Sequence, residues 1–216
     1  MTIIKICGLK TLPDALAAIE SGADYLGFNF YAKSTRHIEV EACAKITPVL
    51  KREHPEIKLV GVFVNSPVDE IQHILKTCSL DLAQLHGDET AEMVNALGGN
   101  AFKSFRGVPP HLNGFARGSA PAFLVDASVK GAYGGTGVTA DWFVAAELAR
   151  QYPLFLAGGL TPENVADAVR QVRPWGVDVA SGVEVPLQLG GKAALGEKDA
   201  VKMSAFVKAV RRLETF

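Results

Sequence analysis

The segment Leu154–Val172, LFLAGGLTPENVADAVRQV, joins a short apolar run to a helical pattern through a pair of glycines. Its first part, Leu154–Ala157, has the length and composition of a buried strand bounded by glycine. Beyond the glycines lies a stripe of apolar residues three or four positions apart, Val165, Val169 and Val172. That spacing is typical of one helix face, so the segment predicts a strand, a turn and a helix.

The same unit recurs along the chain. Seven further short apolar runs are bounded by Gly, Asp, Asn or Pro, and most of the stretches between runs have helical spacing. Only 109–118, with two prolines and two glycines, is a poor helix. The eight predicted strands are Ile3–Ile6, Tyr25–Phe28, Leu59–Phe63, Leu82–Leu85, Ala101–Phe105, Ala122–Val125, Leu154–Ala157 and Gly176–Val179.

Eight strand–helix units of roughly 20–30 residues predict a parallel sheet with helices outside it. Eight such units in a chain of this length fit a closed ring of strands better than an open sheet. We therefore expect an α/β fold of the (β/α)8 TIM-barrel class, with residues 1–216 forming a single domain. A doubly wound sheet with one miscounted strand is the alternative that stays open.

The amino-acid composition indicates which kinds of partner and which cellular location to expect. The chain has 48% hydrophobic and 21% charged residues and a formal net charge of −1 without a basic run, so nothing favours nucleic acid as a partner. No apolar stretch approaches the roughly 18–20 residues that span a bilayer. The opening MTIIKICGLK lacks the apolar region of a signal peptide. We expect a cytoplasmic protein without a membrane partner.

The cysteines and histidines do not form a metal-binding pattern. Three cysteines with wide, irregular spacing are neither a disulfide framework nor a ligand set. The five histidines are equally scattered, at His37, His54, His73, His86 and His111. We therefore expect no metal site.

In a barrel of this class, functional groups lie at the carboxyl ends of the strands and in the loops that follow. Here most of the residues at those positions are polar, reactive or glycine. They are Cys7-Gly8, Asn29, Gln84-Leu85-His86-Gly87, Asp126, Gly158-Gly159 and Ala180-Ser181-Gly182.

The loops after the seventh and eighth predicted strands favour phosphate binding. Each is glycine-rich and leads toward a helix, at Gly158-Gly159 and at Ser181-Gly182. Glycine exposes main-chain N–H groups that can surround a dianion, and barrels hold phosphate at these two loops. One glycine pair alone is usually only a turn.

Cys7 and Asp126 are candidates for a proton-transfer pair across the barrel mouth. A thiol that acts as a base needs a pKa below its ordinary value of about 8.5, through a nearby cation or helix dipole. The aspartate, conversely, has to hold a proton. Taken singly, a cysteine such as Cys7 is more often a buried hydrophobic residue, and an aspartate such as Asp126 is more often a turn or cap residue.

These segments, taken together, resemble the phosphoribosylanthranilate isomerase family of tryptophan biosynthesis. The likeness runs nearly end to end and in order, and the KICG and LAGGLTPENV segments are the most specific. The matching segments are 5–8, 27–28, 34–38, 60–63, 84–87, 124–126, 134–137, 156–165 and 178–184.

The resemblance implies an aldose-to-ketose (Amadori) rearrangement of N-(5-phosphoribosyl)anthranilate, a phosphorylated aminosugar, without a cofactor. It implies that Asp126 protonates the furanose ring oxygen and that Cys7 removes the proton from C2. By the same resemblance Arg36 meets the anthranilate carboxylate, which a planar guanidinium can bind with two hydrogen bonds. Gln84 and His86 then have orienting roles. Monomer and homodimer both stay open.

Two expectations concern the surroundings of the site. Strand alternation places Lys5 on the same face as Cys7, inside the barrel, where Asp178 on the eighth strand is the available counter-charge. We predict a buried Lys5–Asp178 ion pair. The segment 185–196 is longer than the family's usual link into the last helix, and either a surface excursion or a flap fits it.

Other functions remain to be weighed. An indole-glycerol-phosphate synthase-like lyase needs a lysine and a glutamate at strand ends, and a ribulose-phosphate epimerase needs metal-binding histidines. A related histidine-pathway isomerase uses an aspartate where this chain has Cys7. A catalytically dead barrel that serves as a binding module belongs to another class altogether, and a turnover assay separates it from the enzymes.

Overall fold

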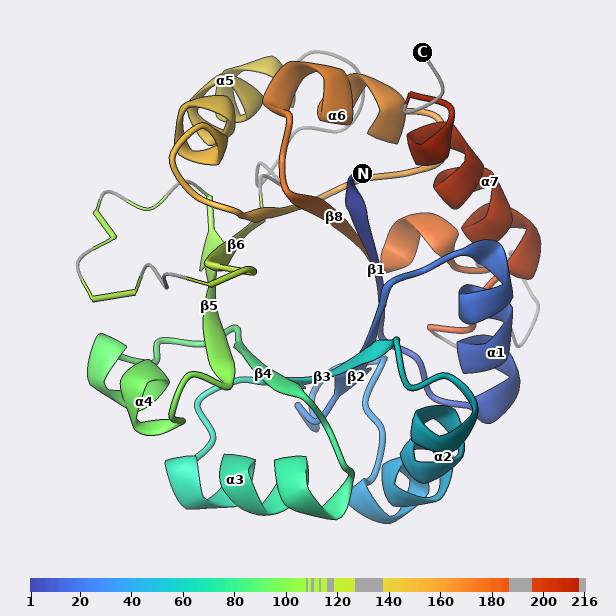
Figure 1. Cartoon of the computed structure of the whole chain (residues 1–216), viewed down its shortest axis with the longest axis vertical. Coiled ribbons are helices and arrows are strands. Elements are labelled where there is room, and N and C mark those ends of the chain that lie inside the picture. Colours follow the sequence, from blue (N-terminus) through green and yellow to red (C-terminus); the bar gives the residue numbers. More distant parts are fainter. Residues whose placement is uncertain are drawn as a thin grey trace.

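Eight parallel strands close into one barrel in sequence order, because the eighth strand pairs with the first (Figure 1). The computed structural model describes residues 1–107, 109, 111–112, 114–115, 119–126, 138–186 and 196–213, with 138–141 described by their backbone alone. The predicted barrel is confirmed. The open, doubly wound alternative is wrong. Such a sheet has two edge strands that each pair on one side only, whereas here β1 and β8 pair with each other and close the ring.

Each strand lies within one residue of its predicted bounds, because runs of apolar residues between glycines and polar residues mark a parallel strand that is buried on both faces. The strands are β1 Ile3–Cys7, β2 Tyr25–Asn29, β3 Lys58–Phe63, β4 Leu82–Leu85, β5 Ala101–Arg106, β6 Phe123–Asp126, β7 Phe155–Ala157 and β8 Gly176–Val179.

Helices form an outer ring around the barrel (Figure 1). Between β5 and β6, where 109–118 predicts a poor helix, none is assigned in the residues that the structure describes. No helix of the described part is both long and apolar enough to cross a membrane. The helices are α1 Leu12–Ser21, α2 Val40–Glu53, α3 Val68–Thr77, α4 Ala91–Ala96, α5 Val138–Ala149, α6 Val165–Val172 and α7 Ala200–Arg211, with a 3-10 turn, η1, at Ser181–Val183.

Aromatic side chains fill the end of the barrel at which the strands begin. Tyr25 and Trp175 both pack edge-on against Phe155, with ring centroids 5.5 and 5.0 Å away. Val60, Phe102 and Leu124 belong to the same interior cluster, and all are fully buried. This plug leaves the opposite end, where the strands finish, as the end with room for a ligand.

Above the aromatic plug lies the predicted ion pair. Lys5 and Asp178 are register partners on β1 and β8, and Lys5 Nζ donates to Asp178 Oδ1 at 2.7 Å. The lysine side chain is 0% exposed and the aspartate side chain 10%. The Lys5–Asp178 pair is therefore confirmed, and it links the two strands that close the ring.

Candidate active site

A cavity of about 460 Å³ opens at the carboxyl ends of the strands. Its walls contain eight of the nine predicted site residues, together with Asn29, Asp178 and Ala180. Gly182 is the one predicted residue that does not line it. The predicted residues in the walls are Cys7, Arg36, Gln84, His86, Asp126, Gly158, Gly159 and Ser181.

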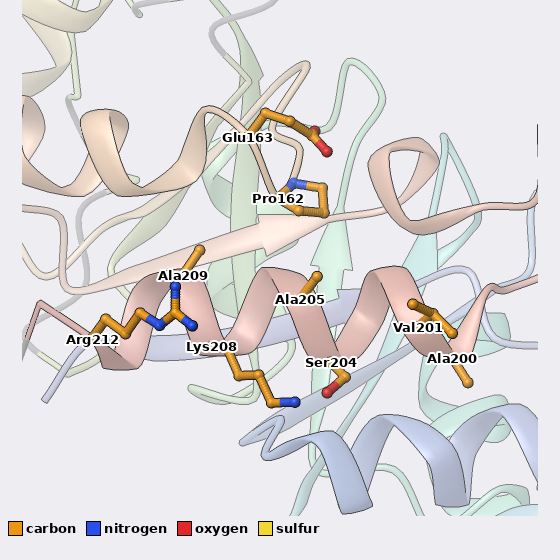
Figure 2. Close-up of a pocket in the computed structure, with 9 residues that line it drawn as sticks. All are labelled: Pro162, Glu163, Ala200, Val201, Ser204, Ala205, Lys208, Ala209 and Arg212. Carbon is orange, nitrogen blue, oxygen red and sulfur yellow. The ribbon is translucent and has the colours of Figure 1, made fainter.

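A larger cavity, of about 640 Å³, lies outside the barrel between α7 and the start of the α6 segment (Figure 2). Pro162 and Glu163 form one side, and small side chains of α7 such as Ala205 form the other. Lys208 points away from Glu163 (Figure 2). Because its charged groups do not converge, this groove has no arrangement for catalysis, and the barrel mouth is the candidate site.

Cys7, the last residue of β1, lines the cavity. Its register partner on the neighbouring strand β2 is Gly27. A Cβ atom on Gly27 would lie 2.6 Å from the Cys7 sulfur, so only glycine leaves room for the thiol. Burial raises the pKa of the Cys7 thiol, while Lys5 and Lys198 act in the opposite direction. The lowered pKa that a thiol base needs is therefore not found here: the cations are present, but loss of water outweighs them.

Asp126 ends β6, on the other side of the ring from Cys7, and lines the same cavity. Its carboxylate influences His86, which follows β4. Burial lowers the pKa of His86, and the negative charges of Asp126 and Asp178 only partly oppose that effect. His86 therefore faces the cavity as a neutral imidazole near pH 7, able to form hydrogen bonds without carrying a charge.

Gln84 lies next to His86 and is 2% exposed. Its Nε2 is 3.4 Å from His86 Nδ1, whereas Gln84 Oε1 has no partner among the described residues. Since a buried amide oxygen normally accepts a hydrogen bond, this atom is available to a ligand or to water in the cavity. The pair fits the predicted orienting role.

A buried ion pair that the sequence analysis missed holds the loop after β4. Lys103 Nζ donates to Glu89 Oε2 at 2.7 Å and to the carbonyl of Gly87 at 2.6 Å. The Glu89 carboxylate in turn accepts from the main-chain N–H groups of Gly87, at 2.9 Å, and Asn65, at 2.8 Å. A lysine within the apolar β5 is the signal that could have revealed it, as it did for Lys5.

The loops after β7 and β8 pack against each other. Gly158 and Gly159 have φ angles of +97° and +64°, which L side chains rarely adopt. A Cβ atom on Gly182 would lie 1.9 Å from the Leu160 carbonyl oxygen. Gly182 is therefore needed for close approach of the loops and does not itself line the cavity, whereas Ser181 does.

Arg36 lines the cavity beside an acidic partner that the sequence analysis did not assign. Its Nε and Nη2 donate to Glu184 Oε1 and Oε2 at 2.5 and 3.0 Å. Glu184 Oε1 also accepts from Lys198 Nζ at 3.0 Å. Burial lowers the pKa of Lys198, and the Glu184 carboxylate opposes that shift. The mouth thus contains a cation–anion–cation triad.

Some predicted features fall outside the described residues. The family-like segment 134–137 is one, and 187–195, the larger part of the long link 185–196, is another. Among the residues that are described, no cluster of three or more His, Cys, Asp and Glu side chains is arranged to hold a metal ion.

The fold and this mouth define a class: a (β/α)8-barrel enzyme with acid–base groups at the carboxyl ends of its strands. The family described as N-(5'phosphoribosyl)anthranilate (PRA) isomerase matches residues 4–209. The chain belongs to that family.

Similar curated proteins and solved structures agree with this family assignment. N-(5'-phosphoribosyl)anthranilate isomerase of Roseiflexus castenholzii is 46% identical, over 97% of this chain and 98% of the relative. That of Geotalea daltonii is 43% identical, over 98% and 97%. The crystal structure of phosphoribosyl anthranilate isomerase from Thermotoga maritima is 34% identical, with a TM-score of 0.79, over 98% and 100% of the two chains.

A further solved structure is of such an isomerase in complex with reduced 1-(o-carboxyphenylamino)-1-deoxyribulose 5-phosphate. It is 33% identical, with a TM-score of 0.76, and covers 98% of this chain and 100% of that one. Each of these matches covers 97% or more of both chains, so the likeness is to whole proteins and not to a fragment of them.

Proposed function

We propose that this chain converts N-(5'-phosphoribosyl)anthranilate into 1-(o-carboxyphenylamino)-1-deoxyribulose 5-phosphate, an isomerisation of tryptophan biosynthesis. One observation carries the proposal beyond family membership: Cys7 and Asp126, from β1 and β6, line a single cavity. An acid and a base on two sides of one ligand are what an Amadori rearrangement requires, because a proton is added at one atom and removed at another.

In the first step Asp126, acting as the general acid, gives a proton to the furanose ring oxygen. The C1–O bond breaks, and the nitrogen lone pair forms an iminium ion at C1. That cation makes the C2–H bond acidic. The Cys7 thiolate then removes the C2 proton, and the electron pair forms an enolamine whose tautomerisation gives the ketose. Although burial makes the thiolate scarce at neutral pH, it also makes that thiolate a stronger base.

The rest of the mouth positions the substrate. Arg36 binds the carboxylate of the aromatic ring. Main-chain N–H groups of the loops after β7 and β8, around Gly158, Gly159 and Ser181, hold the phosphate, whose dianion suits glycine-rich turns. Gly182 allows these two loops to approach each other. Gln84 and His86 bind sugar hydroxyl groups, for which a neutral imidazole and an amide are suited. No step in this scheme needs a cofactor.

Turnover of N-(5'-phosphoribosyl)anthranilate tests the proposal directly. Wild-type protein is expected to consume it, and Cys7→Ser and Asp126→Asn are each expected to lose about 100-fold or more in kcat while remaining folded. The exposed Arg170→Met, which breaks only a surface pair with Asp167, is the control. Full activity in Asp126→Asn would remove the acid from the scheme, and no turnover by the wild type would leave a binding module.

We also propose that residues 1–216 form one domain that works in the cytoplasm, where its three free cysteines stay reduced. Monomer and homodimer both agree with the fold, and the Thermotoga maritima isomerase is described as dimeric. Sedimentation at micromolar concentration decides between the two.

A further inference from the structure

Arg36 is held in a slot built by two glycines. A Cβ atom on Gly8 would lie 2.6 Å from Arg36 Cδ, and one on Gly196 would lie 3.2 Å from Arg36 Cγ. Both glycines have positive φ angles, +82° and +80°. The stem of this arginine is therefore confined between the loop after β1 and the segment that leads into α7, although Arg36 is distant from both in sequence.

Glu184 fixes the guanidinium at the end of that stem. The carboxylate accepts from Nε and Nη2, which form one edge of the planar group. The other edge, Nη1 with the second N–H of Nη2, has no acceptor among the described residues, so a second carboxylate can bind it with two parallel hydrogen bonds. Glu184 itself is held in place, because its main-chain N–H donates to the Ser181 carbonyl at 3.1 Å.

Lys198 supplies the charge that this arrangement would otherwise lack. Its side chain is 0% exposed and donates to Glu184 Oε1 and to the Ala180 carbonyl, both at 3.0 Å. Without Lys198, the Arg36–Glu184 pair is neutral overall, and an incoming carboxylate meets the repulsion of Glu184 at close range. With Lys198, the triad keeps one net positive charge.

We infer that Glu184 and Lys198 are positioning residues that make Arg36 selective for a carboxylated substrate: Glu184 sets the direction of its free edge, and Lys198 cancels the charge of Glu184. This inference rests on the proposed function, in which Arg36 binds the ring carboxylate. Neither residue touches the reacting ring oxygen or C2 in that scheme. Their loss therefore acts first on binding of the carboxylate, and loss of Glu184 leaves the turnover of bound substrate largely intact.

Two probes that differ by one group test the inference. The first is reduced 1-(o-carboxyphenylamino)-1-deoxyribulose 5-phosphate, the compound bound in the related structure. The second is its counterpart without the carboxyl group. The ratio of their dissociation constants, measured by calorimetry, isolates the carboxylate contact from the phosphate contact. We expect the wild type to prefer the carboxylated probe by tenfold or more.

Glu184→Gln is expected to reduce this preference about tenfold, because Arg36 loses its fixed edge, even though the mouth gains positive charge. Lys198→Met is expected to reduce it by a similar factor, because the triad becomes neutral. In Glu184→Gln kcat should change less than threefold. In Lys198→Met kcat should fall further at neutral pH and recover as pH rises, because a cation that lowers the pKa of the Cys7 thiol is lost. The control is Lys208→Met, the same replacement at an exposed position of α7, and it should match the wild type.

The double variant Glu184→Gln/Lys198→Met separates charge from geometry. It restores one positive charge on Arg36, so it should recover part of the preference lost in Lys198→Met; losses that multiply instead would overturn charge compensation. An unchanged or increased preference in Glu184→Gln would overturn the orienting role, and that variant suffices if Lys198→Met does not fold. A wild type that binds neither probe refutes the proposed function itself, whereas equal binding of both refutes the Arg36 contact.

Discussion

Two of the buried lysines, Lys5 and Lys103, lie on strands of the barrel, and their surroundings differ. Lys5 points into the barrel interior and donates to one carboxylate, Asp178, at 2.7 Å. Lys103, which alternation places on the outer face of β5, donates to Glu89 at the same distance but also to the carbonyls of Leu85 and Gly87. One lysine depends on a single counter-charge, whereas the other has a shell of acceptors.

The consequence for function differs as well. Burial opposes the charge on Lys5, but Asp178 and the Cys7 thiol outweigh that effect and hold the pKa of Lys5 above its ordinary value. Lys5 is thus electrically linked to the proposed base, while Lys103 fastens the loop that carries His86. A buried charge can serve the chemistry or the scaffold, and the groups within reach of its ammonium decide which.

Asp178→Asn is expected to have the largest effect on stability. It leaves Lys5 charged, buried and without a counter-ion, which costs about 3–5 kcal/mol in the free energy of unfolding. Urea denaturation followed by circular dichroism measures the loss. A variant as stable as the wild type would mean that Lys5 reaches another acceptor or loses its proton.

Glu89→Gln should cost less, about 2 kcal/mol, because two carbonyls still accept from Lys103. Burial opposes the Glu89 charge, but Lys103 and main-chain amides outweigh it and lower the pKa of this carboxyl. Its contribution is therefore complete above the unfolded-state pKa and is lost as pH falls through the folded-state value. Glu89→Gln should lose less stability on acidification than wild type; an identical acid profile would contradict this assignment.

Removing both charges of the Lys5–Asp178 pair shows how much of the loss in Asp178→Asn comes from the unpaired lysine. Lys5→Met/Asp178→Asn should be more stable than Asp178→Asn alone by about 1–2 kcal/mol, since no unpaired charge stays buried. Denaturant midpoints of the single and double variants give this coupling. If the two substitutions are simply additive, the ion pair contributes nothing beyond its separate side chains.

The smallest expected effect concerns the thiols. Because burial raises the pKa of Cys7, its alkylation by iodoacetamide should be slow at neutral pH and should accelerate as pH rises beyond the usual thiol range near about 8.5. Cys43 and Cys78 are fully buried and should stay unlabelled in the folded protein. Mass spectrometry of the labelled peptides reads each site. A rate at Cys7 that levels off below pH 7 would show a thiolate already formed.

Local pattern was enough for the strands and for one long-range contact. Apolar runs between glycines gave all eight strands, and strand alternation placed Lys5 opposite Asp178, because a closed ring leaves β1 and β8 as neighbours. The cavity walls followed from the rule that strand ends converge, so Cys7 and Asp126 meet one cavity as predicted.

Contacts made by loops were beyond such reasoning. Glu184 reaches Arg36 across 148 positions, and no periodicity fixes where two loop side chains meet. The direction of the Cys7 pKa could not be predicted for a related reason: residue types indicate which charges are near, whereas the loss of water around a sulfur depends on packing in three dimensions. Gly182 likewise proved to serve loop packing rather than the cavity wall.

The aromatic plug of Tyr25, Phe155 and Trp175 makes the interior a blind-ended well. A ligand that enters past the carboxyl ends of the strands has to leave through the same opening. The product must therefore dissociate before the next substrate molecule can bind. The residues around this opening therefore affect both the rate of substrate entry and the rate of product release.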